Sequence, residues 1–275
     1  MLGALYGDVV GSAYEFPRER IEEDFTMFAP GSHFTDDSLM TLAVALTLVA
    51  TKNDRSHYKD TLIRNMKDIA HKYPNVSWGQ KFYKWLFEYT IPVPLNSYGN
   101  GSAMRISPVG WVCDTLEETI ELSKLTTEIT HDHPEGIKGA EAVAVAIFMA
   151  RNGASKEQIK SKMIEYYPEL ETMTLERLGY SGYGFDEFGN WVTCQGSVPQ
   201  AICAFLESAD FKDTIRKAVC LSADTDTQAC IAGSIAEAYY GFTYVDEDKV
   251  LEYFPEDLKR ICSAFRSVQK KRIKR

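Results

Sequence analysis

Two short acidic segments, far apart in the chain, carry the side chains best suited to chemistry. The first is Thr35-Asp36-Asp37, directly before an apolar stretch, and the second is Asp224-Thr225-Asp226-Thr227. Each offers two carboxylates and a threonine hydroxyl, in mirrored order. Taken alone, either segment is typical of a helix start, because threonine and aspartate cap the first turn and complement the helix dipole.

Considered together, the two segments predict a metal site. No lysine or arginine occurs between Arg20 and Lys52, or between Lys217 and Lys249. If the segments converge, four carboxylates share a small volume, which is strongly unfavourable unless cations neutralise them. Carboxylate and hydroxyl oxygens select magnesium, manganese or calcium over zinc. We therefore expect a divalent cation between two helix starts.

The N-terminal segment adds a glycine stripe and a third acidic element. Gly3, Gly7 and Gly11 recur every four residues. Because glycine costs about 1 kcal/mol inside a helix, the stripe predicts close packing against another element. A second face of small residues follows Asp226 and permits the close approach of a helix; it comprises Ala229, Ala232, Gly233 and Ala236. The other face of the N-terminal segment holds Asp8, Ser12 and Glu15, and a solvated carboxylate is the plainer interpretation of Glu15.

Two further polar segments have weaker signals. In Tyr98-Gly99-Asn100-Gly101-Ser102, two glycines allow backbone amides to face an anion, and Arg105 could assist. No Gly-Lys-Ser/Thr follows, so this is not a P-loop, and an ordinary turn fits equally. His131 and His133 are two residues apart and do not share a helix face, which disfavours a zinc site. They fit polar contacts to a ligand or to backbone.

Helical periodicity dominates the elements that must position these residues. Apolar spacing predicts helices over residues 39–50, 61–72, 139–151, 155–167, 198–208, 211–221 and 227–240. We find no strand-like alternation, no repeat and no long Pro/Ser linker. The sequence therefore predicts an all-α single domain over residues 1–269, followed by a basic tail over residues 270–275.

Composition narrows the class of protein further. The 275 residues carry a net charge of −9, and the tail holds five of the 30 basic side chains, so the body disfavours general nucleic-acid binding. Residues 1–16 lack a secretory signal, and no apolar run is long enough for a membrane span. The six cysteines form no C-x-x-C pair and are predicted to be free and mostly buried. We expect a cytoplasmic monomer.

In their order along the chain, these segments resemble the ADP-ribosylglycohydrolase family, which includes the dinitrogenase-reductase-activating glycohydrolase and the ADP-ribosyl-acceptor hydrolases. The matching segments are residues 3–15, 34–40, 98–105, 130–133 and 222–227. Each is common, but the ordered set is specific and spans nearly the whole chain. One departure is Ser222-Ala223, where family members often have two glycines or glycine and asparagine. Both replacements are small and leave the acidic residues intact.

The resemblance implies an orthogonal helical bundle with two magnesium ions at the base of a cleft, manganese being an alternative. The ligands that it implies are Thr35, Asp36, Asp37, Asp224, Asp226 and Thr227. Glu15 matches an acidic residue beside the metals and the scissile bond, and Asp36 or Asp37 would serve as the base. The loop that holds the phosphates and distal ribose of ADP-ribose matches Gly99, Asn100, Gly101 and Ser102, and His131 matches a polar residue lining the cleft.

The activity that the resemblance implies is hydrolysis of the glycosidic bond between ADP-ribose and a modified acceptor. An arginine-linked protein is the first choice, although other conjugates share the same ADP-ribose end. Two alternatives stay open: a non-catalytic ADP-ribose-binding or crystallin-like member, and a magnesium phosphohydrolase that yields AMP. The aromatic-rich segment 179–196 is predicted to stack adenine, to act as a lid, or to be an ordinary surface loop.

Overall fold

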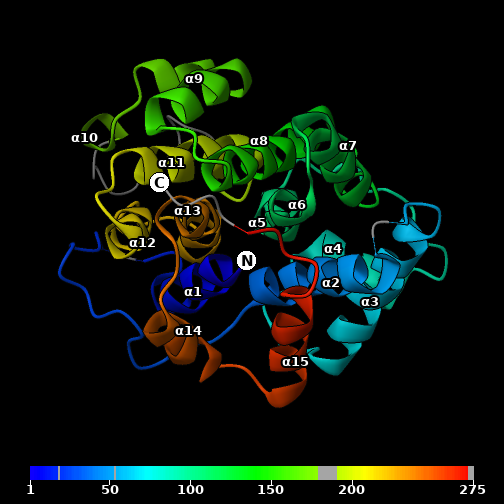
Figure 1. Ribbon diagram of the computed structural model, residues 1–275. Helices are drawn as coiled ribbons and strands as arrows, with labels where there is room; N and C mark the ends of the chain where they lie inside the picture. Colours follow the sequence, from blue (N-terminus) through cyan, green and yellow to red (C-terminus); the bar gives the residue numbers. More distant parts are fainter. Residues whose placement is uncertain (18, 53, 179–190, 272–275) are drawn as a thin grey trace.

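The computed structural model describes residues 1–17, 19–52, 54–178 and 191–271, and within them the secondary structure is helical (Figure 1). The α-helices are α1 (Leu2–Gly11), α2 (Asp36–Thr51), α3 (Tyr58–Lys72), α4 (Gln80–Phe87), α5 (Gly101–Met104), α6 (Ser107–Val112), α7 (Leu116–Thr127), α8 (Pro134–Arg151), α9 (Lys156–Tyr166), α10 (Leu175–Leu178), α11 (Cys194–Leu206), α12 (Phe211–Val219), α13 (Thr225–Tyr240), α14 (Tyr244–Leu251) and α15 (Glu256–Phe265). Two 3₁₀ turns cover Ser12–Tyr14 and Pro168–Glu171. The described chain contains no strand, only an isolated antiparallel bridge between Gly99 and Thr193. The all-α prediction is confirmed.

Helix α13 lies at the centre of the molecule, packed between α1 on one side and α8, α11 and α12 on the others (Figure 1). The contact between α1 and α13 depends on the glycine stripe. A Cβ atom on Gly7 would lie 2.0 Å from the carbonyl oxygen of Ala229, and one on Gly3 would lie 2.3 Å from that of Gly233. These distances are far below van der Waals contact, so the two backbones approach as closely as glycine allows. The packing prediction for both small-residue faces is confirmed.

Helix α2 begins beside α1 and packs against α3 and α15 (Figure 1). Its first residue is fixed by Thr35, whose hydroxyl accepts a hydrogen bond from the Asp37 amide at 3.2 Å. Residues 39–45 are buried, as the apolar stretch predicts. The close contacts of α1 with both α2 and α13 bring the two acidic helix starts to the same place.

Seven helices of the described chain were not predicted from the sequence: α4, α5, α6, α7, α10, α14 and α15. Helices α4 and α15 are clearly amphipathic, whereas α7 has only a weak apolar face. In α7, buried threonines occupy core positions where apolar residues would be expected. Thr119 and Thr126 are fully buried, and each hydroxyl donates to the carbonyl oxygen four residues earlier, at 2.8 and 2.7 Å. Because these hydroxyls are satisfied within the helix, threonine can face the core without the apolar pattern that identifies a helix in sequence.

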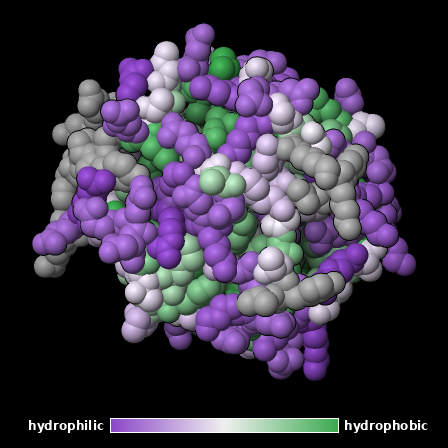
Figure 2. Space-filling model, turned by 60° about the vertical axis from the view of Figure 1, so that its left-hand side comes forward, coloured by the Kyte–Doolittle hydropathy of each residue, from purple (hydrophilic) through white to green (hydrophobic). Residues whose placement is uncertain are grey.

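The structure also bears on the predictions for the cysteines, for membrane spans and for the C-terminal tail. The six cysteines are free and buried, as expected. No helix in the described ranges combines the length and apolarity needed to cross a bilayer. Lys270, the first residue of the predicted tail, donates its backbone N–H to the Trp111 carbonyl at 2.8 Å, and its ammonium group pairs with Asp114 at 3.1 Å. The face seen in Figure 2 is mainly hydrophilic, with hydrophobic side chains showing in gaps between charged ones.

Candidate active site

A carboxylate cluster lies where α1, α2 and α13 meet. Asp8, Asp37 and Asp226 each offer a carboxylate oxygen within 4.8 Å of the others. A second group with the same spacing consists of Glu15, Asp224 and Asp226. Asp226 belongs to both groups, so the two groups are adjacent and share one side chain. The predicted convergence of the two acidic segments is therefore present in the structure.

Asp8 is the central acidic residue that sequence reasoning left out of the site. It is fully buried and accepts three hydrogen bonds: from the Thr35 amide at 3.0 Å, the Thr35 hydroxyl at 2.7 Å and the Ser38 amide at 3.1 Å. These bonds join α1 to the first turn of α2. The sequence feature that could have identified Asp8 as a site residue is its position on the polar face of α1 with Ser12 and Glu15, away from the glycine stripe.

Asp37 retains an oxygen with no hydrogen-bond partner. The Thr227 hydroxyl donates to Asp37 Oδ2 at 3.3 Å, and the Thr35 hydroxyl lies at the same distance but gives its single proton to Asp8. The buried Oδ1 of Asp37 has no partner among the described residues. A buried carboxylate oxygen without a donor is costly unless a cation or water binds it. With oxygen donors on every side, the cluster fits a hard divalent cation.

Asp224 precedes α13 but does not cap it through its side chain. Its Oδ2 instead accepts a 2.6 Å hydrogen bond from the Asn100 amide group, which also donates to the Ser197 hydroxyl at 3.0 Å. Asn100 thus links the glycine loop to the carboxylate cluster. The backbone N–H of Asn100 donates to the Val192 carbonyl at 3.0 Å, and this bond holds the loop beside residues 191–193.

The electrostatics of the cluster follow from burial and like charge. Burial, followed by the charges of Asp226 and Asp8, raises the pKa of Asp36 and of Asp37 well above the ordinary value. Burial also raises the pKa of Asp224 to about 6 and that of Glu15 to about 7, with neighbouring carboxylates adding to both shifts. In the described chain no lysine or arginine forms an ion pair with these carboxylates, so the cluster is suited to bind a cation.

Glu15 sits on a loop held against the segment before α13. The Phe16 amide donates to the Ala223 carbonyl at 3.0 Å, and the Ile21 amide donates to the Ser222 hydroxyl at the same distance. Ser222 has φ of 57°, in the left-handed region that favours glycine. Its hydroxyl contributes a tether for the Glu15 loop that glycine would lack. Ser222, at a position where family members often have glycine, therefore helps to hold this loop in place.

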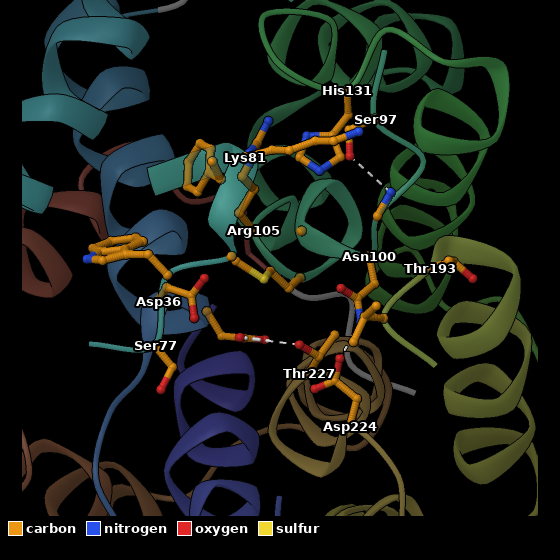
Figure 3. A pocket seen from close by; sticks show the side chains of 18 of the residues that line it. Asp36, Ser77, Lys81, Ser97, Asn100, Arg105, His131, Thr193, Asp224 and Thr227 are labelled. Carbon is orange, nitrogen blue, oxygen red and sulfur yellow. Dashed lines mark hydrogen bonds between the residues drawn. The ribbon is translucent and has the colours of Figure 1, made fainter. Parts of the chain in front are cut away.

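The cluster forms one end of a pocket of about 770 Å³. Figure 3 shows Asp36, Asp224 and Thr227 at that end and Lys81, Arg105 and His131 at the other. Gly99 and Gly101 line the wall between them, and a Cβ on Gly101 would lie 3.3 Å from the Nε2 atom of His131. The pocket is therefore acidic at one end and basic at the other.

His131 presents a defined face to this pocket. Burial, followed by the charge of Arg105, lowers its pKa well below the usual value, so the ring is neutral. Arg105 donates to the Thr130 hydroxyl at 2.7 Å, and that hydroxyl lies 2.7 Å from Nδ1 of His131 with no other acceptor in the described chain. We therefore assign the hydroxyl proton to a bond with Nδ1. The ring proton is then on Nε2, beside the two glycines.

The predicted site residues differ in how they face the pocket. Those that line it are Glu15, Asp36, Asp37, Gly99, Asn100, Gly101, His131, Asp224, Asp226 and Thr227. Thr35 lies behind them, between Asp8 and Asp37. The Ser102 hydroxyl points away and donates to the Gly136 carbonyl at 2.8 Å. Asp36 faces the pocket but lies outside both carboxylate groups. Of the aromatics in segment 179–196, Tyr180, Tyr183, Phe185 and Phe188 lie outside the described residues, and Trp191, which is described, does not line the pocket.

Comparison with known proteins shows likeness over nearly the whole chain. A family model described as ADP-ribosylglycohydrolase matches residues 1–273. The chain is 26% identical to chicken (Gallus gallus) ADP-ribosylhydrolase ARH3, covering 98% of this chain and 89% of that protein. It is 28% identical to ADP-ribosylarginine hydrolase Tri1 of Pseudomonas putida, covering 88% and 69%. A solved structure titled "ADP-ribosylglycohydrolase-related protein complex" shares the fold, with a TM-score of 0.71 at 21% identity, covering 97% of this chain and 95% of that one.

Proposed function

The chain belongs to the ADP-ribosylglycohydrolase family and is a glycosidase-type hydrolase, and from this premise we propose that it is a magnesium-dependent enzyme that releases ADP-ribose from arginine-linked protein conjugates. The observation that carries the proposal is the pair of carboxylate groups sharing Asp226 at one end of the pocket. The arginine linkage is supported by the likeness to the Pseudomonas putida relative, whose name states that linkage.

The donors around the cluster suit two magnesium ions, or manganese. Asp8, Asp37 and Asp226 would hold one ion, and Glu15, Asp224 and Asp226 lie around the place of the other. The Thr35 and Thr227 hydroxyls border the first group through Asp37. When bound, the ions supply Lewis acidity, which orients ribose hydroxyls and makes a water molecule more acidic.

The protein's own residues then divide the remaining work. Asp36, partly exposed and directed into the pocket, would take a proton from the attacking water. Glu15, also partly exposed, would lie beside the second ion and orient the reacting bond with its carboxylate. Gly99, Gly101 and His131 would place the ADP-ribose so that its reacting ribose meets the carboxylate end.

A panel of defined conjugates tests the proposal. Arginine-linked, serine-linked and nucleic-acid-linked ADP-ribose would be incubated with the protein, with magnesium or EDTA, and the products separated. We expect intact ADP-ribose from the arginine conjugate with magnesium. Absence of product from every conjugate would indicate a binding protein, and AMP would indicate a phosphohydrolase.

Matched aspartate variants connect the activity to the cluster. Asp226→Asn removes the charge that both carboxylate groups share and should lower turnover by at least about 100-fold. Asp68→Asn removes one exposed aspartate from α3, away from the pocket, and should leave turnover unchanged. Equal turnover in the two variants would disprove the metal-centred proposal.

A further inference from the structure

The exposed apolar side chains of the described chain gather in and beside the pocket. Six large apolar residues there are more than a third exposed. Three of them line the pocket, namely Phe16, Tyr98 and Val192. The other three lie on α4 and in the segment that follows it, and they are Tyr83, Ile91 and Val93, with exposed fractions of 43%, 77% and 50%. Scattered exposed apolar residues are ordinary, but their concentration around one opening is typical of an interaction surface.

The segment that carries the second group begins and ends at the pocket wall. Residues 77–82 and 96–101 line the pocket, so residues 83–95 leave the wall and return to it. The Trp85 indole N–H donates to the Val93 carbonyl at 3.0 Å, and this bond holds the returning chain against α4. The three exposed side chains of this segment are therefore attached to the rim of the pocket, and together they are called the rim residues.

The charge beside the rim residues differs from that of the whole protein. Helix α4 carries two lysines, Lys81 and Lys84, and no acidic residue, although the net charge of the chain is −9. Both lysines are exposed, and neither forms an ion pair among the described residues. On α3, which packs against α4 (Figure 1), Lys59 and Lys72 are each paired with a carboxylate. The rim thus combines apolar side chains with positive charge that has no partner in the described chain.

We propose that the rim residues and Lys84 dock the polypeptide that flanks the modified side chain of the substrate. This inference rests on the proposed function, because it assumes that the side chain entering the pocket belongs to a protein. The residues on either side of that side chain must then pass over the rim, where the bound ADP-ribose holds them at a high effective concentration. Apolar and acidic flanking residues complement apolar side chains and a lysine.

Two other occupants suit the rim less well. Single-stranded nucleic acid needs a series of aromatic faces, but Tyr83 is the only aromatic rim residue, and its ring already packs against that of Phe87 with centroids 4.6 Å apart. The net charge of −9 also repels a phosphate chain. A second copy in a two-fold dimer would place one rim against the other, so that Lys84 faced its own equivalent.

Peptides that share one linkage but differ in their flanks test the docking. Three peptides of equal length each carry one ADP-ribosylated arginine, flanked by leucine and glutamate, by leucine and lysine, or by glycine and serine. ADP-ribosyl-arginine without a peptide is the fourth substrate. We expect the leucine–glutamate peptide to have the highest kcat/KM, with a KM about tenfold or more below that of the free conjugate.

Substitutions at the rim should remove this preference. The double variant Ile91→Ser/Val93→Ser should raise the KM of the leucine–glutamate peptide to about that of the glycine–serine peptide. The kcat values and the KM of the free conjugate should stay at their wild-type values, because neither residue lines the pocket. Ile91→Val keeps an apolar side chain and should behave like wild type. Both positions are exposed, so these substitutions leave the core intact.

A matched pair of lysines tests the charge. Lys84→Glu should raise the KM of the leucine–glutamate peptide several-fold at low salt and less at high salt, and should lower the KM of the leucine–lysine peptide. Lys124→Glu makes the same change in the last turn of α7, at an exposed lysine that lies outside the pocket and has no ion pair in the described chain. It should leave all four KM values unchanged.

Binding of the same peptides in EDTA, measured by fluorescence anisotropy, separates docking from catalysis. A wild-type preference for the leucine–glutamate peptide that the serine double variant loses supports docking, and if no peptide released ADP-ribose, the proposed function alone would be refuted. Equal KM and equal binding for all peptides, an equal loss for peptide and free conjugate, or equal effects of the two lysine variants would overturn the docking proposal. A dimer that the double variant dissociates, or oligonucleotide binding that Lys84→Glu abolishes, would assign the rim to another occupant and overturn it as well.

Discussion

Replacing Gly7 by alanine tests how strongly the stability of the protein depends on the close contact of α1 and α13. The added Cβ would lie 2.0 Å from the Ala229 carbonyl oxygen and 2.2 Å from its carbon, both backbone atoms that cannot rotate away. Overpacking costs about 1–3 kcal/mol, and a backbone clash belongs at the upper end. The better helix propensity of alanine returns about 1 kcal/mol. The net loss is therefore about 2 kcal/mol.

For a chain of this size, each kcal/mol moves the melting temperature by roughly 2–4 °C. We therefore expect Gly7→Ala to melt about 4–8 °C below wild type in calorimetry or thermal fluorescence. Gly79→Ala is the matched control, because a Cβ at Gly79, just before α4, meets no atom within 4 Å. Its melting temperature should stay within about 1–2 °C of wild type, as for an ordinary surface substitution.

The same substitution should also disturb the carboxylate cluster, since Asp8 follows Gly7 directly. Moving α1 away from α13 separates Asp8 from Asp226 and should weaken binding of magnesium, measured by titration of metal-free protein. Gly79→Ala should bind magnesium like wild type. If Gly7→Ala matched Gly79→Ala in both melting and magnesium affinity, the two helices would have room that the structure does not show, and the reasoning would be refuted.

Three further predictions concern the site itself. Adding EDTA should lower the melting temperature by roughly 5–10 °C, because metal at 100 times its dissociation constant stabilises the folded protein by about 2.7 kcal/mol. Excess magnesium should restore the melting temperature. If neither EDTA nor magnesium changed it, the acidic segments would be helix caps without a metal. Glu15→Gln should bind ADP-ribose with wild-type affinity but have a kcat at least about 100-fold lower. A wild-type kcat would mean that Glu15 is only a solvated carboxylate. Gly101→Val should weaken ADP-ribose binding about tenfold in calorimetry. A Cβ at this position would lie 3.3 Å from Nε2 of His131, and the valine methyl groups would project into the pocket. Unchanged affinity would mean that the loop is an ordinary turn.

The parts of the fold that the sequence predicted are those encoded by one periodic signal. Small residues spaced three or four apart identified both faces of the α1 and α13 contact, and an apolar run identified α2. Among the helices that were missed, α7 buries polar rather than apolar side chains. The threonines of α7 satisfy their hydroxyls on the preceding turn, an arrangement that leaves no trace in hydropathy.

The candidate site was predicted where its residues are adjacent in sequence and missed where they are not. Asp36 and Asp37 form a visible pair, but Asp8 stands alone in a glycine-rich helix. Its role comes from three hydrogen bonds to residues 35 and 38, which only tertiary structure brings near. Arg105 was noted as an assistant to the loop, yet its burial without a counter-ion could not be read from its neighbours in sequence.

The sequence left open whether the two acidic segments are helix caps or metal ligands, and the structure shows that a segment can be both. Thr35 is a cap, since its hydroxyl accepts from the Asp37 amide, and the same hydroxyl donates to Asp8 at 2.7 Å. Capping therefore holds two carboxylates in place instead of competing with them. Asp224 is not a side-chain cap, because Asn100 takes its carboxylate. What distinguishes a site from a pair of caps is thus the direction of the remaining carboxylate oxygens. Here the buried Oδ1 of Asp37 has no donor among the described residues, which suits the binding of a cation.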